Sequence, residues 1–123
     1  MLEPPLVSII DDDVSIRESL PDLLKEYGFS ARTFDSAEAF LATGCVDTSR
    51  CLILDVAMPG MSGPALQGVL KVRRVNLPII FITAHFNARV RAQVLEQGAA
   101  AFLLKPYSDA ALLAALNTAL RQD

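Results

Sequence analysis

Short apolar runs alternate with amphipathic segments along the chain. Five runs of four to six residues, bounded by polar or turn-forming residues, are typical of strands buried in a sheet. The predicted strands cover residues 6–10, 29–34, 51–54, 79–82 and 101–104, of which 29–34 has the weakest pattern. The strand at 51–54 organises the rest, because it ends on Asp55 and is followed by Pro59, Gly60 and Gly63, which break regular structure.

The segments between these strands repeat apolar residues at helical spacing. Helices are expected to begin at Asp13 or Ser15, at Asp35, at Gly63, near Asn87, and at Ser108 or Asp109. The first helix is predicted to bury a stripe formed by Ile16, Leu20, Leu23, Leu24 and Tyr27. Two local expectations can be tested: Glu38 should return a hydrogen bond to the cap of the second helix, and residues 44–49 should form a loop.

This alternation predicts the fold class. Strand and helix follow each other five times, and such a chain forms a parallel sheet with helices on both faces. A length of 123 residues with 52% hydrophobic residues suits one domain with a substantial core. We therefore expect a single α/β domain.

Charge and composition exclude several classes of protein. The net charge is −3 without a basic face, which argues against direct nucleic-acid binding by this chain. The N-terminus lacks the features of a signal peptide, and no apolar run approaches the roughly 18 residues of a membrane span. Cys51 lies in a predicted buried strand, so reduced thiols are favoured over a disulfide with Cys45. A cytoplasmic domain is expected.

Residues able to do chemistry follow four of the five predicted strands. They are Asp11 and Asp12, Asp55, Thr83, and Lys105. In a parallel sheet these strand ends lie along one edge, so the side chains should converge. Crowded carboxylates repel each other, and an all-oxygen cluster suits Mg²⁺. A lysine, a hydroxyl and a hard metal can hold a phosphoryl group, and Asp55 is then the natural nucleophile.

These motifs, in this order, resemble the response-regulator receiver domain, the phosphoacceptor half of bacterial two-component signalling. The matching segments are Ile10-Asp11-Asp12-Asp13, residues 55–63, Ile82-Thr83-Ala84 and Leu104-Lys105-Pro106. Residues 36–41 and Thr83-Ala84-His85 further resemble the FixJ-like branch. The resemblance implies a flavodoxin-like (βα)5 fold with strand order 2-1-3-4-5. It also implies that residues 1–123 form the receiver, without the helix-turn-helix output domain usual in that branch.

The resemblance also implies roles for individual residues around the phosphoryl group. Asp55 would be phosphorylated by a sensor histidine kinase, and Lys105 would pair with the phosphoryl group. Mg²⁺ would be bound by Asp11, Asp12, Asp55 and the backbone carbonyl of Ala57. Ala57 and His85 are unusual at positions expected to tune the rates of phosphorylation and hydrolysis.

A second set of implied roles concerns transmission of the signal. The hydroxyl of Thr83 would move toward the phosphoryl group, and Phe102 would turn inward as it does so. The surface that changes would comprise the helix at 87–97, the strand at 101–104 and the last helix. A phosphorylation-dependent homodimer is predicted on this face, with Arg89 and Arg91 as polar contacts. DNA would be reached only through an output domain.

Two rival hypotheses come from other classes of protein. A metal-dependent phosphatase that forms an aspartyl phosphate needs a second acid close after its nucleophile, but Val56, Ala57, Met58 and Pro59 follow Asp55. A degenerate receiver that only binds a partner would not need Asp55, Thr83 and Lys105 together. Both rivals are therefore weaker than a phosphoacceptor switch.

Overall fold

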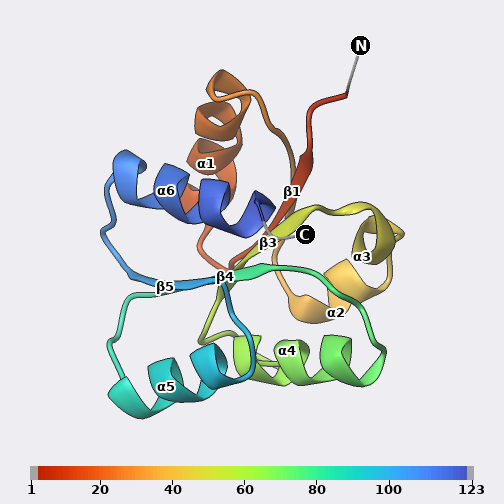
Figure 1. Ribbon diagram of the computed structural model, residues 1–123, viewed down its shortest axis with the longest axis vertical. Helices are drawn as coiled ribbons and strands as arrows, with labels where there is room; N and C mark the ends of the chain where they lie inside the picture. The colour runs from red at the N-terminus through yellow and green to blue at the C-terminus, as the bar shows by residue number, and fades with distance from the viewer. Residues whose placement is uncertain (1–2, 122–123) are drawn as a thin grey trace.

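Five parallel strands pair in the order β2-β1-β3-β4-β5, which confirms the predicted topology (Figure 1). The computed structural model describes residues 3–121. The strands are β1 (Leu6–Ile10), β2 (Ser30–Phe34), β3 (Cys51–Asp55), β4 (Ile79–Thr83) and β5 (Ala101–Leu104). Each matches a predicted apolar run to within one residue at either end.

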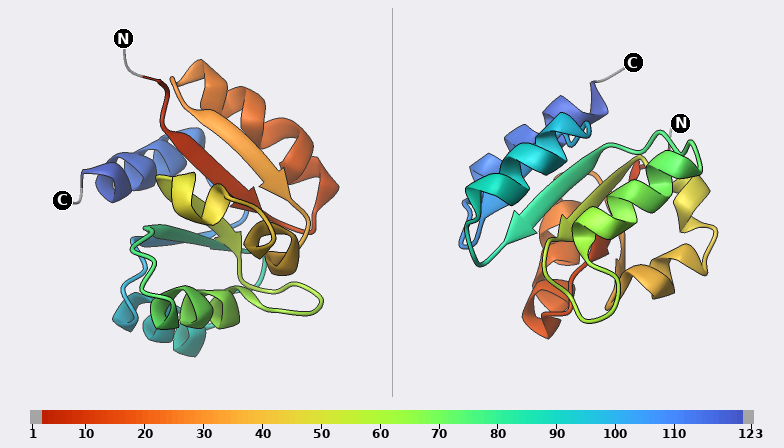
Figure 2. Two further views of the ribbon diagram at one scale, coloured as in Figure 1. Left: turned by 90° about the vertical axis from the view of Figure 1, so that its right-hand side faces the viewer. Right: turned by 90° about the horizontal axis from the view of Figure 1, so that it is seen from below.

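Helices cover both faces of the sheet. They are α1 (Val14–Glu26), α2 (Ala37–Leu41), α3 (Cys45–Thr48), α4 (Gly63–Val72), α5 (Ala88–Glu96) and α6 (Asp109–Leu120). Figures 1 and 2 show α1 and α6 on one face and α2, α4 and α5 on the other. The helix predicted at 87–97 is α5, and the predicted last helix is α6.

The sheet separates two apolar cores. We call them the α1-side core, where Leu20 and Leu24 of α1 and Leu112 and Leu116 of α6 pack, and the α4-side core. The α4-side core contains Phe40 of α2, Leu66 and Leu70 of α4, and Val94 of α5. Successive residues of a strand point to opposite faces, so Ile80 and Ile82 enter one core and Phe81 enters the other.

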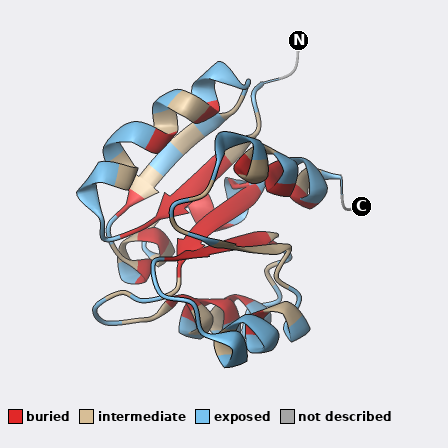
Figure 3. Ribbon diagram, turned by 90° about the vertical axis from the view of Figure 1, so that its left-hand side faces the viewer, coloured by how far each residue is buried: buried red, intermediate tan, exposed pale blue. Residues whose placement is uncertain are grey.

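Burial follows the position of each strand in the sheet. Every residue of β3 and β4 is buried, whereas β2 at the edge alternates between exposed and partly buried residues until it ends on the buried Phe34 (Figure 3). A strand buried on both faces is uniformly apolar, and β3 departs from this rule only at its last residue, Asp55. The sheet thus presents its one carboxylate at the end of its central strand.

Helix caps determine where several helices begin. At the N-termini of five helices, a polar side chain accepts a backbone hydrogen bond. The capping residues are Asp13, Ser36, Ser62, Asn87 and Ser108. Asp13 and Ser108 were each one of two alternatives in the sequence, and they are the residues used. Asp13 therefore serves as a helix cap, with its carboxylate accepting from the N–H of Ser15 at 2.9 Å.

Three local predictions were wrong. Residues 45–48 form the short helix α3, although a loop was expected there. Tyr27 is the residue that follows α1 and is 48% exposed, so it does not extend the buried stripe. Glu38 does not return a bond to the cap of α2, because Ser36 is the cap and Glu38 instead contacts Met61.

The two cysteines are free and buried, as expected for reduced thiols. Cys45 packs in the α4-side core and Cys51 in the α1-side core, on opposite faces of the sheet. Burial raises the pKa of Cys51 to about 12, so its thiol is protonated near neutral pH. Over residues 3–121, no helix is long and apolar enough to cross a membrane.

Candidate functional site

The carboxyl edge of the sheet brings the predicted site residues together. Asp55 and Thr83 are the last residues of β3 and β4, and Asp11 and Lys105 directly follow β1 and β5. Backbone hydrogen bonds continue the pairing past the strand ends, from Lys105 N to Thr83 O at 2.7 Å and from Val56 N to Ile82 O at 2.9 Å. These bonds hold the ends of β3, β4 and β5 in register.

Asp11 is the most deeply buried ionisable group of the site, with no exposed surface. Its Oδ1 accepts a hydrogen bond from the N–H of Asp13 at 2.9 Å. Its Oδ2 lies 3.0 Å from Lys105 Nζ, and the Lys105 side chain is 18% exposed. A buried carboxylate is tolerated only with such partners, and Lys105 is the cation that offsets the burial of Asp11.

Three carboxylates share this corner. Oxygen atoms of Asp11, Asp12 and Asp55 all lie within 4.8 Å of one another, with Asp12 exposed and Asp55 6% exposed. Burial raises the pKa of Asp55 to about 7, the negative charge of Asp11 adds to the rise, and Lys105 opposes it. Burial alone would lower the pKa of Lys105, but its pairing with Asp11 and the charge of Asp55 outweigh this and the pKa is raised.

The acidic cluster fits a hard divalent cation. Although Asp11 Oδ2 is close to Lys105, it is buried and accepts no aligned hydrogen bond from any residue in the range 3–121. A buried oxygen atom whose one close partner is the Lys105 ammonium, beside two further carboxylates, is suited to a metal ligand. Because every donor is an oxygen atom, the preferred ion is Mg²⁺ or Ca²⁺ rather than a transition metal.

Thr83 and Phe102 lie on the neighbouring strands β4 and β5, beside the strand that carries Asp55. Thr83 is 2% exposed, and its hydroxyl donates to the carbonyl of His85 at 3.1 Å and accepts from the N–H of His85 at 3.2 Å. Phe102 pairs in register with Phe81 and packs, partly buried, against the α4-side core. The Thr83 side chain is therefore bonded to the loop before α5.

The loop after Asp55 is packed closely at its far end. Gly63 donates its N–H to the carbonyl of Val56 at 3.0 Å. A Cβ atom at Gly63 would collide with the backbone carbonyl of Asp55 and would stand 3.1 Å from the ring of Phe81. A residue without a side chain is thus required where α4 begins. Ala57, within the loop, is exposed.

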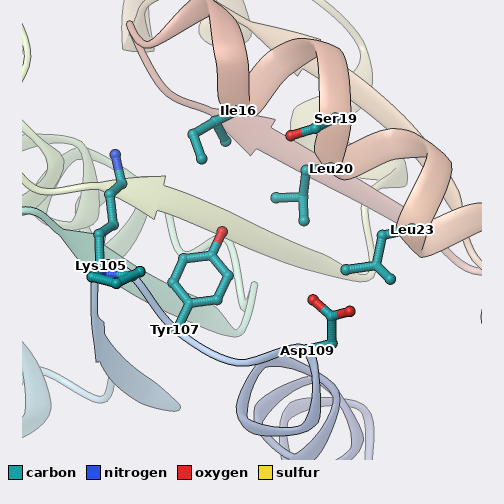
Figure 4. Close-up of a pocket in the computed structure, with 8 residues that line it drawn as sticks. Ile16, Ser19, Leu20, Leu23, Lys105, Tyr107 and Asp109 are labelled. Carbon is teal, nitrogen blue, oxygen red and sulfur yellow. The ribbon is translucent and has the colours of Figure 1, made fainter.

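A cavity of about 520 Å³ adjoins the site between α1 and the start of α6 (Figure 4). Figure 4 shows Tyr107 projecting from the segment after Lys105 toward α1. Burial raises the pKa of Tyr107 to about 12, and the charges of Asp11 and Asp109 contribute to the rise. The cavity is lined by Ile16, Ser19, Leu20, Leu23, Lys105, Pro106, Tyr107 and Asp109.

Sequence reasoning missed one support of the site. Arg17 on α1 donates from Nη1 to the backbone carbonyl of Asp11 at 2.8 Å. The bond fixes the turn that carries Asp11 and brings a positive charge to the acidic edge. A six-residue spacing from Asp11 to a basic residue in the first turns of a helix was the only signal available.

These observations agree with the comparisons with known proteins. The family model described as the response regulator receiver domain matches residues 7–117. The chain belongs to this family. Its fold is accordingly flavodoxin-like, and receivers of this family are regulatory domains of response regulators.

Within this family, the chain is similar to FixJ-like proteins, as both its relatives and solved structures show. The transcriptional regulatory protein TdiR of Thauera aromatica is 44% identical over 93% of this chain and 50% of its own length. The transcriptional regulatory protein FixJ of Azorhizobium caulinodans is 40% identical over 93% of this chain and 54% of its own length. The chain thus spans about half the length of the curated relatives it matches.

Two solved structures support the same placement. The response regulator StyR superposes with a TM-score of 0.89 at 42% identity, over 96% of this chain and 60% of that one. The structure of FixJ-N superposes with a TM-score of 0.87 at 33% identity, over 99% of this chain and 98% of that one.

The raised pKa of Asp55 predicts how stability depends on pH in the absence of metal. The folded protein retains this proton up to about pH 7, whereas the ordinary pKa of the group is 3.8. Protonation therefore favours the folded state, fully below about pH 4, and this contribution is lost as the pH rises through about 7. We expect Asp55→Asn, which cannot ionise, to lack it.

Urea denaturation in a chelating buffer measures this contribution. The free energy of unfolding of Asp55→Asn, relative to the parent, should increase between about pH 4 and pH 7 and level off above that. Subtracting the two proteins cancels the pH dependence that comes from groups without contact with residue 55. A difference that does not change with pH would contradict the raised pKa of Asp55.

Proposed function

We propose that this domain is a phosphoacceptor switch that receives a phosphoryl group on Asp55 from the phosphohistidine of a sensor kinase. The observation that supports it best is the convergence of a buried Asp55, an acidic cluster, a lysine and a buried threonine on one edge of the sheet. Each of these is common alone, but phosphoryl transfer needs them in one place.

The transfer follows from the positions of these groups. A carboxylate oxygen of Asp55 attacks phosphorus, a P–O bond forms, the P–N bond to histidine breaks, and the imidazole nitrogen keeps the electron pair. Lys105 lies at the same corner and would pair with the phosphoryl oxygens in place of Asp11. Asp11, Asp12, Asp55 and the carbonyl of Ala57 would hold Mg²⁺, which supplies charge neutralisation when bound.

The proposal also covers the rest of the protein. TdiR and FixJ are transcriptional regulatory proteins about twice as long as the matched segment, so residues 1–123 would be the receiver of a longer regulator. DNA would then be bound by the output domain and not by this one. A cytoplasmic location is part of the same proposal.

The first prediction concerns the acceptor. With Mg²⁺ and a small phosphodonor, the intact protein should gain about 80 Da, the mass of one phosphoryl group, and Asp55→Asn should gain nothing. Asp47→Asn is a matched control, since Asp47 is an exposed aspartate on α3 outside the acidic cluster. Labelling of Asp55→Asn to the level of the control would mean that another carboxylate is the acceptor.

The second prediction concerns the metal. Mg²⁺ that binds only the folded state raises the melting temperature by mass action, and Asp12→Ala should reduce this rise. Because the variant removes one of three mutually repelling carboxylates, its metal-free melting temperature should also increase.

A matched variant tests whether the effect is specific. Asp22 is another exposed aspartate, on α1 outside the cluster, so Asp22→Ala loses the same charge and should respond to Mg²⁺ like the parent. An Asp12→Ala protein that Mg²⁺ stabilised as strongly as the parent would show that Asp12 is not a ligand.

The signal would leave the site through Thr83 and Phe102. The Thr83 hydroxyl must give up its bonds to His85 in order to donate to a phosphoryl group on Asp55. Phe102 lies on the adjacent strand, next to the space that this movement opens. The altered surface would then comprise α5, β5 and α6, where Arg89 and Arg91 are exposed and Leu104 is 46% exposed.

The third prediction concerns this face. Phosphorylation should change amide hydrogen exchange over residues 83–107 and should produce a homodimer detectable by solution mass, and Phe102→Ala should weaken both responses. An unchanged mass would exclude dimerisation but retain the switch. Unchanged exchange over the whole segment would exclude the switch as well.

A further inference from the structure

The side chain of Glu38 crosses from α2 to the loop that follows Asp55. Glu38 Oε2 accepts a hydrogen bond from the backbone N–H of Met61 at 3.1 Å, 23 residues further along the chain. The N-terminus of α2 does not need this carboxylate, because Ser36 Oγ accepts from the N–H of Ala39 at 3.0 Å. Glu38 is therefore free to act outside its own helix.

A second observation places the carboxylate of Glu38 against the same loop. Gly60 has a positive φ of 76°, which favours glycine. A Cβ atom at Gly60 would stand 2.8 Å from Glu38 Oε2, closer than a Cβ atom approaches another heavy atom. The Glu38 carboxylate thus lies close to the backbone of Gly60 and also accepts the hydrogen bond from Met61.

The β3–α4 loop (residues 56–62) has few other attachments. Its ends are fixed by Val56 N to Ile82 O and by Gly63 N to Val56 O. Within the described residues, the bond from Glu38 is the only hydrogen bond that joins segment 57–61 to another part of the chain. Met58 and Met61 add apolar contacts to the α4-side core, but these do not fix the direction of a backbone carbonyl.

We propose that Glu38 is a positioning residue for the acidic site, acting through the β3–α4 loop. It holds segment 57–61 in one conformation and so fixes the backbone carbonyl of Ala57, two residues beyond Asp55, for use as a metal ligand. The proposal rests on the proposed function only where it concerns Mg²⁺. The contact of Glu38 with the loop can be tested in the metal-free protein.

The charge of Glu38 is an alternative explanation for any effect on Mg²⁺, since a nearby anion attracts a cation through space. Two variants separate the effects. Glu38→Ala removes both the acceptor and the charge, whereas Glu38→Gln removes the charge but keeps an oxygen that can accept from Met61. Glu26→Ala, an exposed glutamate at the end of α1, loses the same charge away from the loop.

The first measurement is the exchange rate of the Met61 amide hydrogen in metal-free protein, and the second is Mg²⁺ affinity by calorimetry. Glu38→Ala should speed exchange at Met61 and weaken Mg²⁺ binding, each by about threefold to tenfold, the range for one exposed hydrogen bond. Glu38→Gln should restore most of the slow exchange at Met61 and most of the Mg²⁺ affinity. Glu26→Ala should match the parent in both measurements.

Gly60→Ala supplies an independent test, because its new methyl group would meet the carboxylate of Glu38. The loss of Mg²⁺ affinity caused by Gly60→Ala should be smaller in the Glu38→Ala background than in the parent. Backbone strain at Gly60 is the same in both backgrounds, so the difference between the two losses measures the contact itself.

The outcomes distinguish this inference from the proposed function. Unchanged Met61 exchange in Glu38→Ala would overturn the contact, and faster exchange with unchanged Mg²⁺ affinity would overturn the positioning role. Equal weakening in Glu38→Ala and Glu38→Gln would assign the effect to charge and overturn the inference too. If the parent bound no Mg²⁺, both the proposed function and the positioning role would fail, but Met61 exchange would still decide the contact.

Discussion

A surplus of negative charge in a buried corner is the constraint on which the site depends. Asp11 has no contact with solvent, and Lys105 at 3.0 Å is the cation that offsets the loss of its hydration. Asp12 and Asp55 then add carboxylates within 4.8 Å, more than one lysine can balance. Burial and, after it, the negative charge of Asp11 raise the pKa of Asp55 to about 7, against the opposing effect of Lys105. A metal-free site of this kind favours any ligand that brings positive charge.

The sheet creates this constraint and confines it. Because β3 and β4 are parallel and buried along their whole length, their carboxylate and hydroxyl groups stand only at the carboxyl ends, as Asp55 and Thr83. Backbone pairing past the strand ends and the close contact of Gly63 with the Asp55 carbonyl leave these residues little freedom. Main-chain geometry thus determines the positions of the functional residues, and neighbouring side chains change the electrostatic environment of the site.

The sequence was a good guide wherever one physical rule dominated. Apolar runs predicted all five strands, and a parallel sheet then required Asp11, Asp55, Thr83 and Lys105 to meet. Prediction failed where a segment was too short to show a periodic pattern, or where two neighbouring residues could each cap a helix. The four residues of α3 are too few to show a helical period, and the role of Glu38 depended on whether Asp35 or Ser36 caps α2.

Side-chain directions at the site were beyond sequence reasoning. The hydroxyl of Thr83 could have pointed toward Asp55 or toward its own loop, and nothing local to the sequence decides between them. The bond from Arg17 to the Asp11 carbonyl depends in the same way on how α1 packs on the sheet.

The division of the apolar core into two parts by the sheet has a further consequence. Phe102 belongs with the α4-side core, whereas α1 and α6 pack on the other. A change in the packing of α1 can therefore reach Phe102 only through the strands of the sheet.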